Sequence, residues 1–246
     1  MSKTLCSLSF ETTNNYNTNL QTLLKLIKET KEDSIIVAPE VCLTAYDYDN
    51  FEEAVAFAKV ATQAIKKVSK NKIIILTMLE AKGDKVYNFA KVFNNEKVVY
   101  KQAKAKLFKF GEEHHYMEAG NEEDIRIIEI DGIKIGLFIC FELRFKDLWQ
   151  RLEGADVIAV PSWWGHLRRE NFKTLTQALA IMNQCFVVAS DSLNDECTGE
   201  SGIISPFGVV KRNGVIAHLQ VHYSKKEILK MRKYMAVGIT SDTKIR

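Results

Sequence analysis

The sequence predicts an α/β protein in which mixed β-sheets carry helices on their outer faces. The first observation is that apolar residues switch repeatedly between helical spacing and the short apolar runs of strands. The second is that tight hairpins join several predicted strands, whereas neighbours in a purely parallel sheet need long crossover connections. Because no linker or low-complexity segment interrupts this pattern, we expect residues 1–246 to form a single domain, with a C-terminal helix and tail over about 224–246.

The first part of the chain shows two apolar stripes with helical spacing, over residues 20–27 and 54–68. Around them lie short runs rich in isoleucine, valine and aromatic residues, which are typical of strands. Asn94-Asn95 separates the last two runs and is a candidate hairpin turn. The strands predicted in this part are residues 4–10, 34–38, 72–79, 86–93 and 97–100.

The later part of the chain repeats the alternation. Asp131-Gly132 joins two apolar runs and is a strong signal for a two-residue hairpin, and Asn213-Gly214 predicts another turn. Helices are predicted near residues 145–152, over 171–183 and over 225–234, the last of them basic and amphipathic. The strands predicted in this part are residues 125–130, 133–140, 156–160, 186–190, 202–205 and 215–221.

The composition describes an ordinary globular protein and excludes several function classes. Hydrophobic residues make up 46% and charged residues 26%, and the net charge of +3 is too small to argue for a nucleic-acid or anionic-membrane partner. No apolar run reaches the roughly 18 residues of a membrane span, and the N-terminal residues lack a secretory signal. Since the five cysteines contain no C-x-x-C pair, we expect a reduced, cytoplasmic protein.

Cys140 is a candidate nucleophile. It ends the apolar run IKIGLFIC, and a helical pattern follows at once. At such a strand-to-helix turn, backbone N–H groups are available to an oxyanion, and the helix dipole with nearby cations is expected to favour the thiolate. The alternative is a buried structural cysteine, which is the commoner environment for this residue type.

A nucleophilic cysteine needs a base, and two kinds of residue compete for that role. His166 would make a papain-like pair with Cys140, with weak support from the sequence. Glu40 is the better candidate, because it directly follows Pro39 at the end of a predicted strand and lies in an apolar stretch. Several lysines over residues 101–109 offer a cation, although they also fit the solvated face of an edge strand.

Taken together, these segments resemble the nitrilase superfamily of carbon–nitrogen hydrolases. The matching motifs are APEVCLTAYDY around Glu40, then KAKLFKFGEEHHYMEAG, and GLFICFELRF around Cys140. PSWWGHLRRENFKTLTQALAIMNQCFVVASD and GESGIISPFGVV follow in the family's order, so the likeness covers roughly residues 4–240. The resemblance implies a four-layer α-β-β-α sandwich with two mixed β-sheets, and a site that needs no metal or organic cofactor.

The resemblance also implies which charged residues belong to the site. The family pattern Lys-x-(His or Arg)-Leu-Phe places the catalytic lysine at Lys104, and Lys106 is the residue most easily mistaken for it because a strand would put both on one face. The family uses a second glutamate a few residues later. In the match Gly-Glu-x-x-x-Tyr, Glu112 fits this position better than Glu113.

The chemistry of an amide or nitrile carbon explains this set of residues. Cys140 would attack and form a thioester, while Glu40 would take the thiol proton, pass a proton to ammonia and activate water. Lys104 and the backbone N–H of Phe141 would stabilise the oxyanion. Glu112 would hydrogen-bond Lys104 or orient the substrate.

Residues after the predicted strand 156–160 are candidates for the substrate pocket. Trp163, Trp164 and His166 lie on the same expected edge as Cys140 and would wall the pocket, although simple packing explains the tryptophans equally well. This stretch resembles the omega-amidase-like branch, whose members take small amides with a distal carboxylate.

An arginine would suit such a carboxylate, because its guanidinium group binds carboxylates through two hydrogen bonds. Arg168 or Arg169 is the candidate in this chain, and the alternative is that both are solvated.

Several functions remain in competition. The leading hypothesis is a thiol amidase that releases ammonia from a small linear carboxamide. Within the superfamily, the alternatives are a nitrilase, an N-carbamoyl-amine hydrolase and an acyltransferase. A catalytically idle interaction module is the alternative of another class, but such a module would be free to lose Glu40, Lys104 or Cys140, and all three are present.

The chain departs from the family pattern at two places. LAIMN over residues 179–183 stands where the family has Arg-Ala-x-Glu-Asn, and Phe141-Glu142 stands where tyrosine and aspartate are common. Members of the family pair through helices, so a homodimer or larger homo-oligomer is expected, and apolar Leu179 and Met182 would suit such packing. The basic last helix would either dock on a subunit or form a solvated cap.

Overall fold

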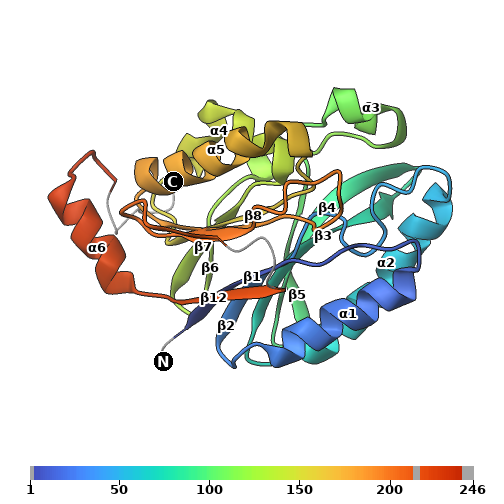
Figure 1. The fold of residues 1–246 in the computed structure, drawn as a ribbon, viewed down its shortest axis with the longest axis horizontal. Coiled ribbons are helices and arrows are strands. Elements are labelled where there is room, and N and C mark those ends of the chain that lie inside the picture. The colour runs from blue at the N-terminus through green and yellow to red at the C-terminus, as the bar shows by residue number, and fades with distance from the viewer. Residues whose placement is uncertain (1–2, 213–216, 240–246) are drawn as a thin grey trace.

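Two six-stranded sheets lie face to face, and helices cover the outer side of each (Figure 1). This computed structural model describes residues 3–212 and 217–239. The expected four-layer α-β-β-α sandwich is therefore confirmed. The turn predicted at Asn213-Gly214 and the first two residues of the strand predicted over 215–221 lie outside the described residues.

The first sheet has the strand order β12-β1-β2-β3-β4-β5. Its centre is parallel, because β1, β2 and β3 are separated by helical crossovers, whereas β4, β5 and β12 are antiparallel to their neighbours. Its strands are β1 (Thr4–Leu8), β2 (Ser34–Val37), β3 (Ile73–Lys82), β4 (Lys85–Asn94), β5 (Lys97–Ala103) and β12 (His218–His222).

The second sheet has the order β11-β10-β9-β8-β7-β6, with β7, β8 and β9 parallel. The hairpin predicted at Asp131-Gly132 is confirmed, since these residues have φ of 53° and 73° and join β6 to β7. Its strands are β6 (Ile128–Ile130), β7 (Ile133–Leu137), β8 (Val157–Pro161), β9 (Phe186–Ser190), β10 (Gly202–Ile204) and β11 (Val210–Arg212). The sequence did not predict β11, which is a short and largely exposed edge strand.

The hairpin between β4 and β5 differs by one residue from the expectation. Asn94 pairs with Lys97, so the two turn residues are Asn95 and Glu96, both with positive φ. Asn94 itself is the last residue of β4. The predicted turn at Asn94-Asn95 was therefore placed one residue too early.

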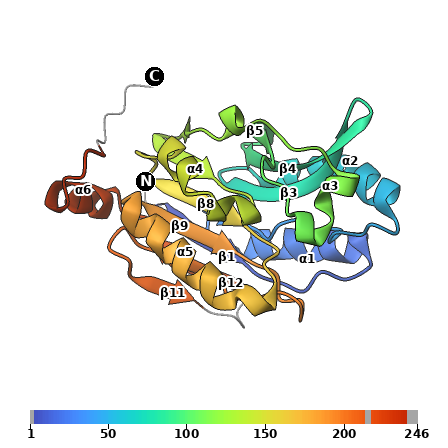
Figure 2. The ribbon, with the colours of Figure 1, turned by 90° about the horizontal axis from the view of Figure 1, so that it is seen from above.

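Most helices lie where apolar stripes predicted them, whereas the short helix α3 was not predicted. Helices α1 and α2 cover the first sheet, and α4 and α5 cover the second, as the view from above also shows (Figure 2). Besides single 3₁₀ turns, the described helices are α1 (Tyr16–Glu29), α2 (Phe51–Val68), α3 (Glu113–Tyr116), α4 (Lys146–Arg151), α5 (Arg169–Met182) and α6 (Lys225–Tyr234). None of them is both long and apolar enough to cross a membrane.

Apolar side chains fill the space on both faces of the parallel strands. Successive residues of a strand point to opposite faces, so Ile35 faces the second sheet while Ile36 packs under α1 and α2. This explains why the strands read as continuous rather than alternating apolar runs. The buried thiols of all five cysteines are free.

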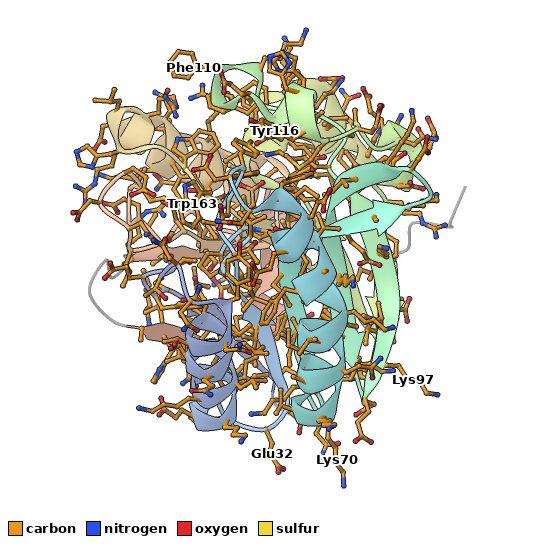
Figure 3. All side chains as sticks on the ribbon, turned by 90° about the vertical axis from the view of Figure 1, so that its right-hand side faces the viewer. Glu32, Lys70, Lys97, Phe110, Tyr116 and Trp163 are labelled. Atoms are coloured by element: carbon orange, nitrogen blue, oxygen red, sulfur yellow. The ribbon has the colours of Figure 1, made fainter. Side chains whose placement is uncertain are left out.

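The topology brings the carboxyl ends of four strands to one end of the molecule. Strands β2 and β5 run in the same direction in the first sheet, as do β7 and β8 in the second. In Figure 3, Phe110, Tyr116 and Trp163 lie in the upper part, far from Glu32, Lys70 and Lys97, which lie near the starts of strands at the bottom. Polar residues that follow these strands therefore meet.

A buried ion pair attaches α6 to the opposite, amino-terminal end of the second sheet. Asp156 is fully buried and accepts hydrogen bonds from Lys225 Nζ, at 2.6 and 2.8 Å, and from the backbone N–H of Lys134 at 3.1 Å. Arg232 of the same helix donates to the Ala155 carbonyl at 2.6 Å. The basic helix therefore docks on its own chain through charge.

The Asp156→Asn variant should lower the free energy of unfolding by about 1.5–3 kcal/mol, because it removes the charge of a buried acceptor that holds an ammonium group. Urea unfolding monitored by circular dichroism measures this change. As a control, Glu170→Gln removes the surface pair with Lys173 and should change stability by less than about 0.5 kcal/mol. Equal midpoints for Asp156→Asn and wild type would show that the pair does not stabilise the fold.

Candidate active site

Three charged or nucleophilic residues leave the ends of three strands and converge between the two sheets. Glu40 follows β2, Lys104 follows β5 and Cys140 follows β7. All three are buried, with Glu40 and Lys104 at 0% exposure and Cys140 at 7%. The structure thus brings together the three residues that the sequence motifs singled out.

The carboxylate of Glu40 is held by four donors that are unequally distributed over its two oxygens. Oε1 accepts from Tyr46 Oη at 2.7 Å, Lys104 Nζ at 2.8 Å and Asn88 Nδ2 at 2.9 Å. Oε2 accepts from the backbone N–H of Trp163 at 3.0 Å. Oε1 is therefore saturated, and Oε2 keeps acceptor capacity for a further proton donor.

Lys104 lies between two carboxylates. Its ammonium group donates to Glu40 Oε1 at 2.8 Å, to Glu113 Oε1 at 2.6 Å and to Tyr46 Oη at 3.2 Å. Burial by itself lowers the pKa of Lys104, but the negative charges of Glu40 and Glu113 outweigh burial and hold its pKa above the usual value. The lysine is consequently a fixed cation.

The backbone around Lys104 is equally fixed. Its N–H donates to the Asn88 carbonyl and its carbonyl accepts from Gly120, both at 2.8 Å. A Cβ on Gly120 would lie 2.5 Å from the Ala103 oxygen, so only glycine permits this approach of the two segments.

The second glutamate of the site is Glu113, which corrects the expectation of Glu112. Glu112 has φ of 59°, caps the short helix α3 and is exposed, so its side chain points away from Lys104. Glu113 is buried, and its Oε2 also accepts from the Phe108 backbone N–H at 3.0 Å. The turn before α3, which motif spacing alone did not resolve, decides which glutamate faces inward.

Lys106 is separated from Lys104 by the end of the strand. Strand β5 stops at Ala103, and the chain bends after Lys104, so the two lysines do not share a strand face. Lys106 forms an ion pair with Glu122 and lies over the Phe145 ring at 4.9 Å. Lys104 is therefore the lysine that faces Glu40.

Cys140 occupies a strained turn. Its φ is 46°, a region that side chains other than glycine rarely adopt, and it begins the 3₁₀ turn Cys140–Arg144. The thiol Sγ lies 3.7 Å from the Trp163 carbonyl oxygen. This backbone conformation turns the thiol out of the strand and toward the cavity.

The surroundings of Cys140 raise the pKa of its thiol, contrary to the expectation that they favour the thiolate. Burial raises its pKa well above the ordinary value, and the negative charge of Glu40 raises it further, while Lys104 only partly offsets both. The helix that follows is a short 3₁₀ turn with little dipole. A proton must therefore leave the sulfur during attack.

A cavity of about 550 Å³ opens over Cys140. Trp163 is half-buried in its wall, whereas Trp164 is buried against Phe172 and donates through Nε1 to the Arg168 carbonyl at 3.0 Å. Trp164 borders only a smaller recess beside Cys140. Trp163 therefore lines the cavity, whereas Trp164 mainly packs in the interior.

Phe141 and His166 also lie near the cavity. The Phe141 ring packs against Phe108 and Phe145 at the recess, with ring centroids 5.0 and 5.3 Å apart. His166 is exposed at the rim, and the charge of Glu40, not this imidazole, acts on the pKa of Cys140.

Two arginines face the recess beside Cys140. Arg168 lies over the Phe108 ring at 5.2 Å, and Arg144 lies over the Trp164 ring at 4.9 Å. Among the described residues, neither has a carboxylate partner, whereas Arg169 pairs with Glu200 at 2.6 Å. Burial and the like charge of Arg168 lower the pKa of Arg144, so an anion between them would be favourable.

Sequence reasoning missed Tyr46 and Asn88, which both bind Glu40. Asn88 carried a usable signal, because an amide inside the apolar strand KVYNFAKVFN needs a buried partner. Tyr46 lies six residues after Glu40 in a loop, and nothing in its spacing indicated a contact. Arg144, four residues after Cys140, was also not singled out. Over residues 3–212 and 217–239, no group of three or more His, Cys, Asp and Glu side chains is arranged to hold a metal ion.

Comparison with known proteins identifies the fold and the family. The carbon-nitrogen hydrolase family model matches residues 5–214. A 2-oxoglutaramate amidase of Bacillus subtilis (strain 168) is 34% identical over 199 residues, covering 76% of each chain. A deaminated glutathione amidase of Escherichia coli O157:H7 is 29% identical over 214 residues, covering 81% of each.

A solved structure agrees with the fold. Saccharomyces cerevisiae Nit3, a member of branch 10 of the nitrilase superfamily, superposes with a TM-score of 0.84 at 20% identity, covering 99% of this chain and 97% of that one. Together with the family model and the amidase relatives, this agreement shows that the chain belongs to the carbon–nitrogen hydrolase family, the nitrilase superfamily that its motifs resemble.

Proposed function

We propose that this protein is a thiol amidase that releases ammonia from a small linear carboxamide, with Cys140 as nucleophile, Glu40 as general acid and base, and Lys104 as oxyanion stabiliser. The observation that carries the proposal is the fully buried Glu40 carboxylate, which lies beside the Cys140 thiol and is bound to the buried ammonium group of Lys104. This arrangement brings the base, the nucleophile and the cation of acyl transfer together, with Cys140 lining the cavity and Glu40 and Lys104 fully buried.

Attack on the amide carbon begins with loss of the thiol proton. Glu40 Oε2 takes this proton because Oε1 is occupied by three donors, and the sulfur forms a bond to the carbonyl carbon. The carbonyl π electrons move onto oxygen, and Lys104 with the backbone N–H of Phe141 stabilises this charge. Because the three N–H groups of Lys104 donate to Glu40, Glu113 and Tyr46, the ammonium group stays in place and acts on the developing charge electrostatically.

Collapse of the tetrahedral intermediate releases ammonia. Glu40 returns its proton to the amide nitrogen, the carbon–nitrogen bond breaks, and a thioester to Cys140 remains. A water molecule then replaces ammonia, Glu40 takes one of its protons, and the water oxygen forms a bond to the thioester carbon. The carbon–sulfur bond breaks as Glu40 returns the proton to sulfur, which gives the carboxylic acid and the thiol. Acylation therefore ends with Glu40 ionised and Cys140 held as a thioester, and deacylation restores the Cys140 thiol with Glu40 again ionised.

Glu113 keeps Lys104 in place during both steps. It is the second carboxylate on the ammonium group, and its pKa is raised by burial despite the opposing charge of Lys104. We assign it a positioning role toward Lys104, with its backbone contact to Phe108 fixing its own orientation.

The substrate is proposed to be an amide with a distal carboxylate. Arg168 and Arg144 supply two guanidinium groups on the recess beside Cys140, and Trp163 and His166 line the main cavity. The relative named 2-oxoglutaramate amidase acts, by its name, on such an amide. Gly165 allows this arrangement, because a Cβ there would lie 2.3 Å from Arg168 Nη2.

The other functions open from the sequence have weaker support. A nitrilase, an N-carbamoyl-amine hydrolase or an acyltransferase would use the same three residues, but the two relatives compared above, at 34% and 29% identity, are named amidases. An idle interaction module has no need for a cation buried between two carboxylates.

We further propose a cytoplasmic homo-oligomer built from one domain over residues 1–246. One apolar cluster joins the facing sheets, and the five cysteines are free thiols. Leu179 is buried in its own subunit and is not available for pairing, which corrects its suggested role, whereas Met182 and Val209 are 63% and 61% exposed. We assign the subunit contact to the exposed apolar residues at the end of α5 and beside β11.

Mass spectrometry of rapidly quenched reactions with a panel of small amides should detect an acyl adduct on Cys140, together with ammonia release, because hydrolysis passes through a thioester. The Cys140→Ala variant should show neither. If folded wild-type protein forms no adduct and releases no ammonia with any amide of the panel, the amidase assignment is wrong.

Arg168→Ala should raise KM for a dicarboxylic monoamide by about 10- to 100-fold, because it removes charged hydrogen bonds to the distal carboxylate. KM for a neutral amide of similar length should change less than about twofold. Arg169→Ala is the matched control, since Arg169 already pairs with Glu200. Equal effects of Arg168→Ala on both amides would exclude the carboxylate contact.

A further inference from the structure

The carboxylate of Glu142 connects the two segments that carry Cys140 and Lys104. Its Oε1 accepts from the Ala105 backbone N–H at 2.6 Å, and its Oε2 accepts from the Ile139 backbone N–H at 2.7 Å. Ala105 directly follows Lys104, and Ile139 directly precedes Cys140. The Glu142 side chain therefore binds the residue after Lys104, which follows a strand of the first sheet. It also binds the residue before Cys140, which follows a strand of the second sheet.

The two hydrogen bonds of Glu142, here called the Glu142 bridge, lie in the dry interior and involve no cation. Glu142 is 0% exposed, and both of its bonds are made to backbone N–H groups that have no other role at these positions. Lys104 acts on it only through its charge. Charged acceptors make stronger hydrogen bonds than neutral ones, so an ionised carboxylate is the species that holds both segments best.

The turn that begins at Cys140 needs such support. A non-glycine residue at φ of 46° costs about 1–3 kcal/mol and persists only where the surroundings hold it. Glu142 closes this turn in two ways, since its own N–H donates to the Ile139 carbonyl at 3.1 Å while its carboxylate binds the Ile139 N–H. The bond to Ala105 then fixes the closed turn to the segment of Lys104.

We infer that Glu142 is a positioning residue whose single buried carboxylate sets the separation between the Cys140 thiol and the Lys104 ammonium group. This inference rests on the proposed roles of Cys140 and Lys104. It assigns a function to the residue that replaces the family's common aspartate, and the longer side chain spans the two backbone groups.

The bridge is sensitive to protonation. Burial raises the pKa of Glu142 from 4.5 to about 7, although its two backbone hydrogen bonds and the charge of Lys104 lower it. Glu40 raises it, and Tyr100 of β5 is the other titratable group that interacts with it. A protonated Glu142 would turn one acceptor into an O–H donor that faces an N–H donor, so one of the two bonds would be lost.

Activity and stability should consequently respond to pH in opposite directions. Since its pKa is raised in the fold, Glu142 binds more protons in the folded than in the unfolded state between about pH 4.5 and 7, and its contribution to stability falls as pH rises. Its positioning function, in contrast, requires the ionised form present above pH 7. A carboxyl group with a merely structural role would change stability with pH but would not change activity.

The test compares Glu142→Gln and Glu142→Asp with wild type. The glutamine keeps the volume but directs an NH2 group at one N–H donor, so kcat should fall about 10- to 100-fold with KM changed less than twofold. The fall in wild-type kcat below pH 7 should be absent in Glu142→Gln. Glu142→Asp keeps the charge, so its kcat should be higher than that of Glu142→Gln and should again fall below pH 7.

Asp156→Asn is the matched control, because Asp156 is equally buried and also binds a backbone N–H, but at the other end of the sheet. It should lower the unfolding midpoint and leave kcat per folded molecule and the pH profile unchanged. The inference is overturned if Glu142→Gln keeps the kcat of wild type and the fall in kcat below pH 7. It is also overturned if the fraction of unfolded protein alone accounts for the lost activity of Glu142→Gln.

An assay without substrate separates this inference from the proposed function. The rate at which iodoacetamide alkylates Cys140, followed by peptide mass spectrometry at pH 7, should fall several-fold in Glu142→Gln because the thiol is no longer held beside Glu40. If wild type hydrolyses no amide, the proposed function fails while alkylation still tests Glu142. Equal alkylation rates in wild type and Glu142→Gln would exclude the positioning role.

Discussion

The buried ammonium group of Lys104, held between the carboxylates of Glu40 and Glu113, is the interaction on which the rest of the site depends. An unpaired charge at this depth would be strongly unfavourable, so the three groups must stay together once the cavity is dry. They come from the loop after β2, the end of β5 and the start of α3. Their pairing therefore fixes three separate segments at one end of the sandwich.

Two carboxylates and one ammonium group leave an excess negative charge beside Cys140. Burial and the negative charge of Glu40 raise the pKa of the thiol, so the proposed attack needs a base, and Glu40 is the carboxylate beside the sulfur. Tyr46, Asn88 and Lys104 all donate to Oε1 of Glu40. Oε2 is therefore the oxygen that is left to accept a proton. The electrostatics of the site thus select both the reacting oxygen and the form of the sulfur.

The apolar scaffold and the polar site are separated along the same strands. Apolar residues, mostly isoleucine and valine, fill both faces of β2 and β8 and of the first part of β3, and polar residues of the site follow the ends of β2 and β8. A residue after a strand is free to adopt a turn, as Cys140 does, and its contacts then come from other segments. This separation lets the sheets remain rigid while their ends carry strained and charged groups.

Features that depend on neighbours in the chain could be predicted from the sequence, whereas features that depend on distant segments could not. Local periodicity and turn residues were sufficient for most helices and strands, because these depend on neighbours in the chain, and the ordered motifs were sufficient for Glu40, Lys104 and Cys140. They were insufficient for Glu113, since Glu112 and Glu113 are equivalent in spacing and differ only in the left-handed turn that orients them.

The sequence by itself determined the family, the alternation of helices and strands, and the three residues that meet at the strand ends. Only the tertiary structure decided that the pKa of the Cys140 thiol is raised, that Leu179 is core rather than surface, and that Glu142 bridges the segments of Lys104 and Cys140. The physical reason is that burial, charge neighbours and hydrogen-bond partners from distant segments do not exist until the two sheets close on each other.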